Sequence, residues 1–323
     1  MKKLILLVAS IIIAMTAFGC QKEENKLTVY APDGAPALAL VKAMDNLDIY
    51  DFNVTSADVI QTVVTGDKKA DICVLPINLA SKLLGNGKDY KMLGVLTHGN
   101  FYFISSSSEQ VGVDTAQNLI GKTVGVVQLA SFAGLSLKAS LSSLGISYNE
   151  LINGRQKDSN KVNLLPISAT EIGTANVDLY LAPSPIADVK ANALNYNFAG
   201  SLNDLYVGGD IPQAVVVCKT ELISSNLDAV KQFVSNLHGV KNYLLNGDKE
   251  DICSTINNNL ERGLTPQFSS ANLSSNIIER SCIYFTPSRE CYSEVDIFLS
   301  KIKSVAPNSV GAISNDFYYL EIL

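Results

Sequence analysis

The stretch LTVYAPDGAPALAL, residues Leu27–Leu40, combines a strand, a turn and the start of a helix. Its first residues, Leu27–Tyr30, are apolar or β-favouring and predict a short buried strand. Pro32-Asp33-Gly34 predicts a turn, because proline removes a donor from the strand ladder and glycine accepts a positive φ. From Pro36 onward, alanine, leucine and valine predict a closely packed apolar helix. We interpret the stretch as a strand–turn–helix unit.

The turn in this unit has two interpretations. It leaves backbone N–H groups unpaired at the carboxyl end of the strand, which suits a polar ligand, but it could equally be a connection that binds nothing. Asp33 shares this ambiguity: its carboxylate either caps the turn or faces a ligand that donates hydrogen bonds. The stretch alone does not choose between them.

The first twenty residues predict an exported lipoprotein. Lys2-Lys3 precedes an apolar segment, Leu4–Phe18, that is too short for an ordinary membrane span. The following Ala17-Phe18-Gly19-Cys20 resembles the lipobox of bacterial lipoproteins, in which the cysteine carries the lipid. We therefore expect residues 1–19 to be a signal peptide, Cys20 to be lipidated and residues 20–26 to form a charged tether.

Charge and size narrow the class of protein. Without Lys2 and Lys3, the 25 basic residues fall to 23 against 31 acidic ones, which leaves a net charge of −8. No basic cluster interrupts this balance, so we do not expect nucleic acid as a partner. A chain of 323 residues with 47% hydrophobic content is long enough for two domains, each with a sizeable core.

The cysteines and histidines do not suggest a metal or redox site. Cys73 and Cys218 lie in apolar, strand-like runs and are expected to be buried. Three other cysteines lie late in the chain: Cys253, Cys282 and Cys291. In an exported protein, two of them could form a disulfide, and the sequence does not indicate which two. The chain has no CxxC motif, and its two histidines lack metal-ligand spacing, so neither a metal nor a cofactor is expected.

Strands and helices alternate in two series. In the first, strands are expected at 49–54, 70–75 and 91–97 after the opening unit. A further strand at 101–105 precedes the second series, whose strands are expected at 123–127, 162–167 and 177–182. Such alternation predicts parallel pairing with right-handed crossovers, so the turns gather on one edge of each sheet.

Two polar breaks, near 105–110 and 207–212, separate these series from the rest of the chain. After the second break we expect one strand and then helices through Lys303, with no third alternating series. We therefore predict two α/β lobes joined by two crossings that act as a hinge. Residues 27–105 plus 212–323 would form lobe I, and residues 106–211 lobe II.

Five segments carry a resemblance to a known family. They read APDGAPALAL, NLIGKTVGVV, ATEIGTANVDLYLAPSP, IPQAVVVCKTELISSNLDAVKQFV and PNSVGAISNDFYY. Together they resemble bacterial ABC-importer substrate-binding lipoproteins of the nitrate, sulfonate, taurine and thiamine-precursor branch, called SsuA/THI5-like or NMT1-like. The resemblance implies an α/β, type 2 periplasmic-binding-protein fold that holds a ligand in the cleft between two lobes. It does not imply which ligand.

The resemblance also implies that the ligand contacts come from turns at strand ends. The ligand-binding candidates are Asp33, Gly34, Asn78, His98, Asn100, Gln128, Ser131, Phe132, Pro183, Ser184 and Gln213. Ser131 and Phe132 begin a helix directly after a strand, where N–H groups suit an oxyanion or a ring carbonyl, although Ser131 could simply be an N-cap. Many relatives carry an acidic residue where this chain has Ala182, so its contact is not expected here.

The leading hypothesis is a receptor without catalytic residues. It would be lipid-anchored to the outer side of the bacterial membrane, capture a small heteroaromatic or sulfonate-type nutrient and deliver it to an ABC permease and its ATPase. An enzyme of the same fold and a ligand-sensing lipoprotein without transport are the alternatives. Export and the lack of a GxSxG or Ser/His/Asp pattern argue against the enzyme.

Overall fold

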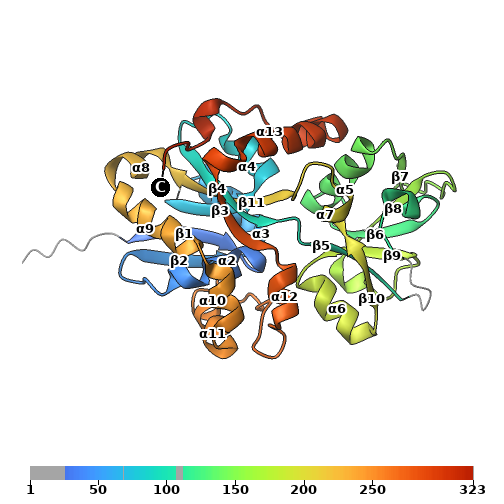
Figure 1. Ribbon diagram of the computed structural model, residues 1–323, viewed down its shortest axis with the longest axis horizontal. Coiled ribbons are helices and arrows are strands. Elements are labelled where there is room, and N and C mark those ends of the chain that lie inside the picture. The colour runs from blue at the N-terminus through green and yellow to red at the C-terminus, as the bar shows by residue number, and fades with distance from the viewer. Residues whose placement is uncertain (1–25, 68, 107–111, 323) are drawn as a thin grey trace, which may run out of the picture.

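The computed structural model describes residues 26–67, 69–106 and 112–322 (Figure 1). The expected signal peptide, the lipidated Cys20 and the tether up to residue 25 lie outside the described residues. Within these ranges, no helix combines the length and the apolar character needed to cross a membrane.

The first sheet has six strands in the order β12-β4-β11-β3-β1-β2. Its strands are β1 (Leu27–Pro32), β2 (Tyr50–Thr55), β3 (Ile72–Pro76), β4 (Tyr90–His98), β11 (Pro212–Lys219) and β12 (Ile283–Pro287). β1 pairs in parallel with β2 and β3, whereas β11 runs antiparallel between β3 and β4. The helices α2 (Ala35–Met44), α3 (Ala57–Thr65) and α4 (Ile77–Leu84) follow the first three strands.

The second sheet also has six strands, in the order β10-β5-β9-β6-β8-β7. They are β5 (Phe101–Ser105), β6 (Thr123–Val127), β7 (Tyr148–Glu150), β8 (Val162–Ile167), β9 (Leu179–Pro183) and β10 (Asn197–Ser201). Its helices are α5 (Phe132–Ser143), α6 (Ile186–Leu194) and α7 (Leu202–Leu205). The two sheets lie side by side and define two halves of the molecule (Figure 1).

The first crossing between the sheets comes earlier than expected. The predicted boundary of lobe I at residue 105 is wrong by one strand, because β5 pairs antiparallel with β9 and β10 in the second sheet. The polar break follows this strand, and the chain crosses at Gly99-Asn100. Here the two crossings touch: the Gly99 N–H donates to the Ile211 carbonyl at 2.9 Å. A Cβ at Gly99 would overlap Asn203 Oδ1 and lie 2.9 Å from Ile211 Cβ, so this approach requires glycine.

The helices after β11 cover the first sheet. They are α8 (Thr220–Ser225), α9 (Leu227–Leu237), α10 (Val240–Asn246), α11 (Lys249–Asn258), α12 (Ser275–Arg280) and α13 (Ser288–Val305). The expectation of helices through Lys303 misses β12, which adds to β4 at the edge of the first sheet. Only one of the five residues of β12 is fully buried, so it lacks the apolar run that marks an interior strand.

One apolar cluster continues through both halves because α13 packs against α5 (Figure 1). At this contact the Phe132 ring lies 5.7 Å from Phe298 on α13 and 6.0 Å from Phe101 on β5. Rings at these distances contribute about 0.5–1.5 kcal/mol per pair beyond their burial. The halves therefore share a core on the side of α13.

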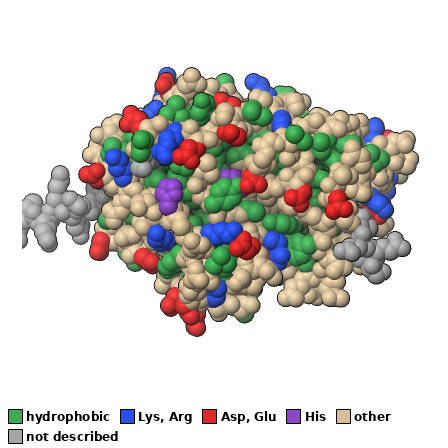
Figure 2. Space-filling view, viewed as in Figure 1, with side chains coloured by type: hydrophobic (Ala, Val, Ile, Leu, Met, Phe, Trp, Pro, Cys, Tyr) green, Lys and Arg blue, Asp and Glu red, His purple; other side chains and the backbone are tan. Residues whose placement is uncertain are grey.

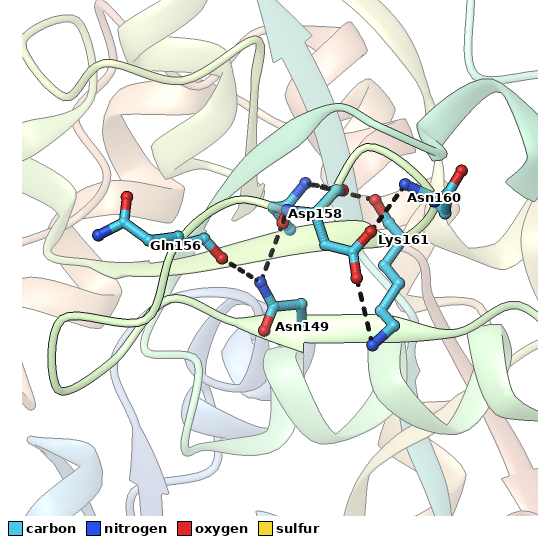
Figure 3. Close-up of polar contacts among 6 residues, drawn as sticks. Asn149, Gln156, Asp158, Asn160 and Lys161 are labelled. Carbon is cyan, nitrogen blue, oxygen red and sulfur yellow. Dashed lines mark hydrogen bonds and ion pairs between the residues drawn. The ribbon is translucent and has the colours of Figure 1, made fainter.

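Polar contacts hold the loop between β7 and β8, and Figure 3 shows Asn149, Asp158 and Lys161 among them. The Asn163 side chain is fully buried, and its Oδ1 accepts from the Asp158 N–H at 2.8 Å and from Asn149 Nδ2 at 3.1 Å. Its Nδ2 donates to the Asp158 carbonyl at 2.9 Å. Asp158 Oδ2 also pairs with Lys161 Nζ at 3.3 Å. These bonds hold a polar loop that has little apolar packing of its own.

The five described cysteines are free thiols. Cys73 and Cys218 are fully buried in β3 and β11, as expected of small apolar side chains. No disulfide links Cys253, Cys282 and Cys291, which lie on α11, in the turn after α12 and on α13.

Candidate functional site

The first crossing is tied to the second sheet by a reciprocal pair of hydrogen bonds. The Ser184 N–H donates to the Asn100 carbonyl at 2.8 Å, and Asn100 Nδ2 donates to the Ser184 carbonyl at 3.0 Å. The Asn100 N–H donates to Gln213 Oε1 at 3.1 Å. Three of the predicted ligand residues, from β11, the crossing and the end of β9, therefore meet at one point. Pro183 joins them as the β9 partner of Phe101.

His98, at the end of β4, lies against Tyr284 of β12. The two rings are stacked with centroids 3.6 Å apart, and the Tyr284 hydroxyl donates to the carboxylate of Asp210 in the second crossing. Burial lowers the pKa of His98 to about 4, against the opposing effect of Asp210, so the imidazole is neutral at pH 7. Burial and the bond to Asp210 both raise the pKa of Tyr284.

Three buried side-chain atoms at this crossing have no hydrogen-bond partner among the described residues. They are Thr97 Oγ1, His98 Nδ1 and Asn100 Oδ1, on side chains that are at most 5% exposed. Buried polar atoms are nearly always paired, so each of these atoms marks a position where a polar group or ordered water can complete the bonding.

A chain of polar contacts leads from the crossing to the first half of the molecule. The Ser184 hydroxyl donates to Asp188 Oδ2 at 2.6 Å, and Arg280 Nε donates to Asp188 Oδ1 at 2.5 Å. Asp188 lies on α6 and Arg280 on α12, so this ion pair links the two halves. The Arg280 guanidinium also lies 4.2 Å from the ring centre of Phe198 on β10.

A pocket of about 420 Å³ opens beside this ion pair. One wall is α6 with β10, and the other is the segment 271–280, which ends in α12. The volume falls within the range of small-molecule sites, and both halves supply its wall. A molecule bound here would contact both halves at once.

The comparisons with known proteins agree with this architecture. The model of the family described as NMT1/THI5 like matches residues 46–248, which is more than half of the chain. The chain belongs to the NMT1/THI5-like family. This confirms the resemblance drawn from the sequence. A comparison with curated proteins finds no match.

Solved structures similar to this NMT1/THI5-like protein share its fold. An ABC transporter protein from Parabacteroides distasonis is 16% identical with a TM-score of 0.70, over 92% of this chain and 99% of that one. The ligand-binding component of an ABC-type import system from Staphylococcus aureus, with zinc bound, is 13% identical with a TM-score of 0.62, over 92% and 97%. The periplasmic aliphatic sulphonate-binding protein SsuA from Escherichia coli is 13% identical with a TM-score of 0.61, over 91% and 92%. The predicted periplasmic-binding-protein fold is therefore confirmed.

Other predicted site residues of the NMT1/THI5-like protein make different contacts. In the opening turn, Asp33 Oδ1 accepts from the Gly34 N–H at 2.7 Å and Oδ2 accepts from the Gln267 N–H at 2.9 Å. Burial raises the pKa of Asp33, while these two bonds oppose the shift. The Asp33 carboxylate thus caps the turn and holds the segment around Gln267. Whether it also contacts a ligand stays a prediction.

The remaining candidates lie apart from the crossing cluster in their contacts. Asn78 Nδ2 donates to the Ser309 carbonyl at 3.4 Å, and its Oδ1 is buried without a partner among the described residues. Gln128 and Ser131 are exposed, and Ser131 occupies the N-cap of α5 without a side-chain capping bond. Phe132 is buried in the aromatic contact with α13. Their roles in ligand binding stay predictions.

Sequence reasoning missed four residues of this site: Asp188, Arg280, Tyr284 and Asp210. Of these four, only Asp188 could have been noticed in the sequence, because it is an acidic residue in an otherwise apolar helix start. Its partner Arg280 lies 92 positions away on a short helix, and local patterns do not predict such a pair.

No group of three or more metal-ligating side chains occurs in the part of the chain that the structure describes. On the face shown in Figure 2, acidic and basic side chains are interspersed and no basic patch stands out.

Proposed function

We propose that this protein is a solute-binding lipoprotein of an ABC importer. It captures a small organic nutrient between its two halves and presents it to a permease that is driven by an ATPase. Lipidation at Cys20 would hold it on the outer side of the bacterial membrane. Membership of the NMT1/THI5-like family and likeness to ABC-import binding proteins support this role over an enzymatic one.

One observation carries the proposal: the pocket beside Asp188 and Arg280 is walled by both halves. A solute bound there makes contacts to both walls only when the halves are close. It therefore binds the closed arrangement more tightly and shifts the population toward it. A closed form with a distinct surface is what a permease needs in order to recognise loaded protein.

The proposal is tested by native mass spectrometry of the protein purified without denaturation. A small molecule bound at one per chain is expected, and Asn276→Trp on α12 should lose it because the indole occupies the pocket. Asn257→Trp, on the exposed side of α11, is the matched control and should retain it. Equal retention in both variants would place any solute elsewhere.

The anchor is tested separately. Full-length protein expressed in a bacterial host should fractionate with the membrane, and Cys20→Ala should release it. Release of the unsubstituted protein into the soluble fraction would contradict the lipoprotein assignment.

A further inference from the structure

The pocket contains two charged side chains and several amides. Among the described residues that line it, Asp188 and Arg280 are the charged ones. The other side chains with polar groups are Asn192, Asn195, Tyr196, Asn272, Ser274 and Asn276. What the pocket selects therefore depends on how the two charges are arranged.

Arg280 alone would make this an oxyanion site, because a guanidinium presents a fork of N–H groups that matches carboxylate or sulfonate oxygens. Its Nε donates to Asp188 Oδ1, and its guanidinium carbon lies over the ring of Phe198. The planar group is thus held in place, and its charge is balanced within 2.5 Å by a carboxylate whose side chain is 3% exposed. The pocket contains a fixed donor without net positive charge.

No unpaired cation lies beside the ion pair among the described residues that line the pocket. An oxyanion entering here would approach the buried Asp188 carboxylate without an unbalanced cation to offset its charge.

We propose that Asp188 is a specificity-determining residue that keeps oxyanions out of the pocket. This inference rests on the proposed function and names the class of solute. The bound molecule is an uncharged polar compound, which accepts from the terminal N–H groups of Arg280 and pairs with the asparagine amides. A sulfonate-type nutrient, which the family resemblance suggests, does not fit this arrangement.

The test uses a matched pair of probes, ethanesulfonate and the uncharged ethanesulfonamide, titrated calorimetrically into four proteins. Asp188→Asn keeps one oxygen that accepts from Arg280, and its Nδ2 can donate to the Ser184 hydroxyl, which then acts as the acceptor. The substitution removes the negative charge, so the affinity for ethanesulfonate should rise at least about tenfold over that of the unsubstituted protein. Adding Arg280→Gln to that variant should abolish the gain. Asp58→Asn, an equal charge change on the exposed face of α3, should have no effect.

One result would overturn the inference: ethanesulfonate that binds no more tightly to Asp188→Asn than to the unsubstituted protein. Circular dichroism melting establishes that each variant folds. If Asp188→Asn does not fold, the unsubstituted protein is compared with Arg280→Gln. Ethanesulfonate binding that is present in the unsubstituted protein and lost in Arg280→Gln would contradict the exclusion of oxyanions by Asp188. No ethanesulfonate binding in the unsubstituted protein would support it.

The failure of this inference differs from the failure of the proposed function. A co-purified oxyanion that Arg280→Gln releases would contradict the exclusion of oxyanions by Asp188 but would leave solute capture intact. If Asp188→Asn gains ethanesulfonate binding but the purified protein never contains a bound solute, the exclusion of oxyanions by Asp188 is supported and solute capture is not.

Discussion

Asn100 and Ser184 exchange two hydrogen bonds, backbone to backbone at 2.8 Å and side chain to backbone at 3.0 Å, across the point where the chain leaves the first sheet. The pair joins the crossing to the end of β9. Because Ser184 also bonds Asp188, the same contact leads to the ion pair that links the halves. The crossing and the pocket are therefore mechanically connected.

Asn100→Ala removes the side-chain bond and leaves the Ser184 carbonyl without that donor. Asn100 is 2% exposed, so we expect the free energy of unfolding to fall by about 1–3 kcal/mol. Urea denaturation measures it. Asn257→Ala on the exposed side of α11 is the control and should change stability by less than about 0.5 kcal/mol. An equal effect in the two variants would show that the reciprocal bonds do not hold the crossing.

The buried imidazole of His98 predicts acid sensitivity. Its pKa is about 4 in the folded protein and about 6.5 when unfolded, so the unfolded chain binds more protons between these values. Stability contributed by the neutral imidazole is complete above pH 6.5 and is lost as the pH falls toward 4. At pH 5 the loss is about 2 kcal/mol relative to pH 8.

The pH effect is isolated by comparison with His98→Phe, which keeps a ring against Tyr284 and cannot titrate. Urea denaturation at pH 8 and pH 5 should show a smaller loss in this variant by about 2 kcal/mol. His238→Phe should retain the full loss. Identical pH dependence in His98→Phe and the unsubstituted protein would mean that His98 does not stay neutral.

Asn163 predicts a local rather than a global weakness. Asn163→Ala removes the bonds of Asn163 to the N–H and the carbonyl of Asp158 and one of the two bonds of the Asn149 amide. Unfolding should therefore become easier by about 2–3 kcal/mol. Amide hydrogen exchange should rise first in the loop 151–161 (Figure 3). Uniform exchange across both sheets, with the loop no faster than the rest, would contradict the role given to Asn163.

The sequence predicts the elements better than the contacts between them. In the opening stretch, the strand, turn and helix appear as β1, a turn at Asp33-Gly34 and α2. This succeeds because each preference there is local: proline and glycine stop the strand, and a run of small apolar residues forms the helix. β12 was missed because an edge strand, half-exposed and next to a turn, carries no alternating pattern.

Sequence reasoning named residues of this crossing where they adjoin strand ends or the return crossing. His98, Asn100 and Ser184 are ligand candidates because the carboxyl ends of strands gather in this class of fold, and Gln213 is one because it begins the strand after the second crossing. Their contact with a ligand stays a prediction. Arg280 and Tyr284 were not, since their partners are distant in sequence and become neighbours only through the packing of α12 and β12. The predicted boundary at residue 105 was wrong for a related reason. β5 belongs to the second sheet because it pairs with β9 and β10, which are distant in sequence.

A solute that binds between the halves should draw them together. Small-angle X-ray scattering measures this on natively purified protein, before and after its bound solute is removed by dialysis under denaturing conditions and refolding. We predict a larger radius of gyration after removal, and a return to the smaller value when the solute identified by mass spectrometry is restored. Identical scattering in all three samples, with the solute shown to be bound, would contradict the claim.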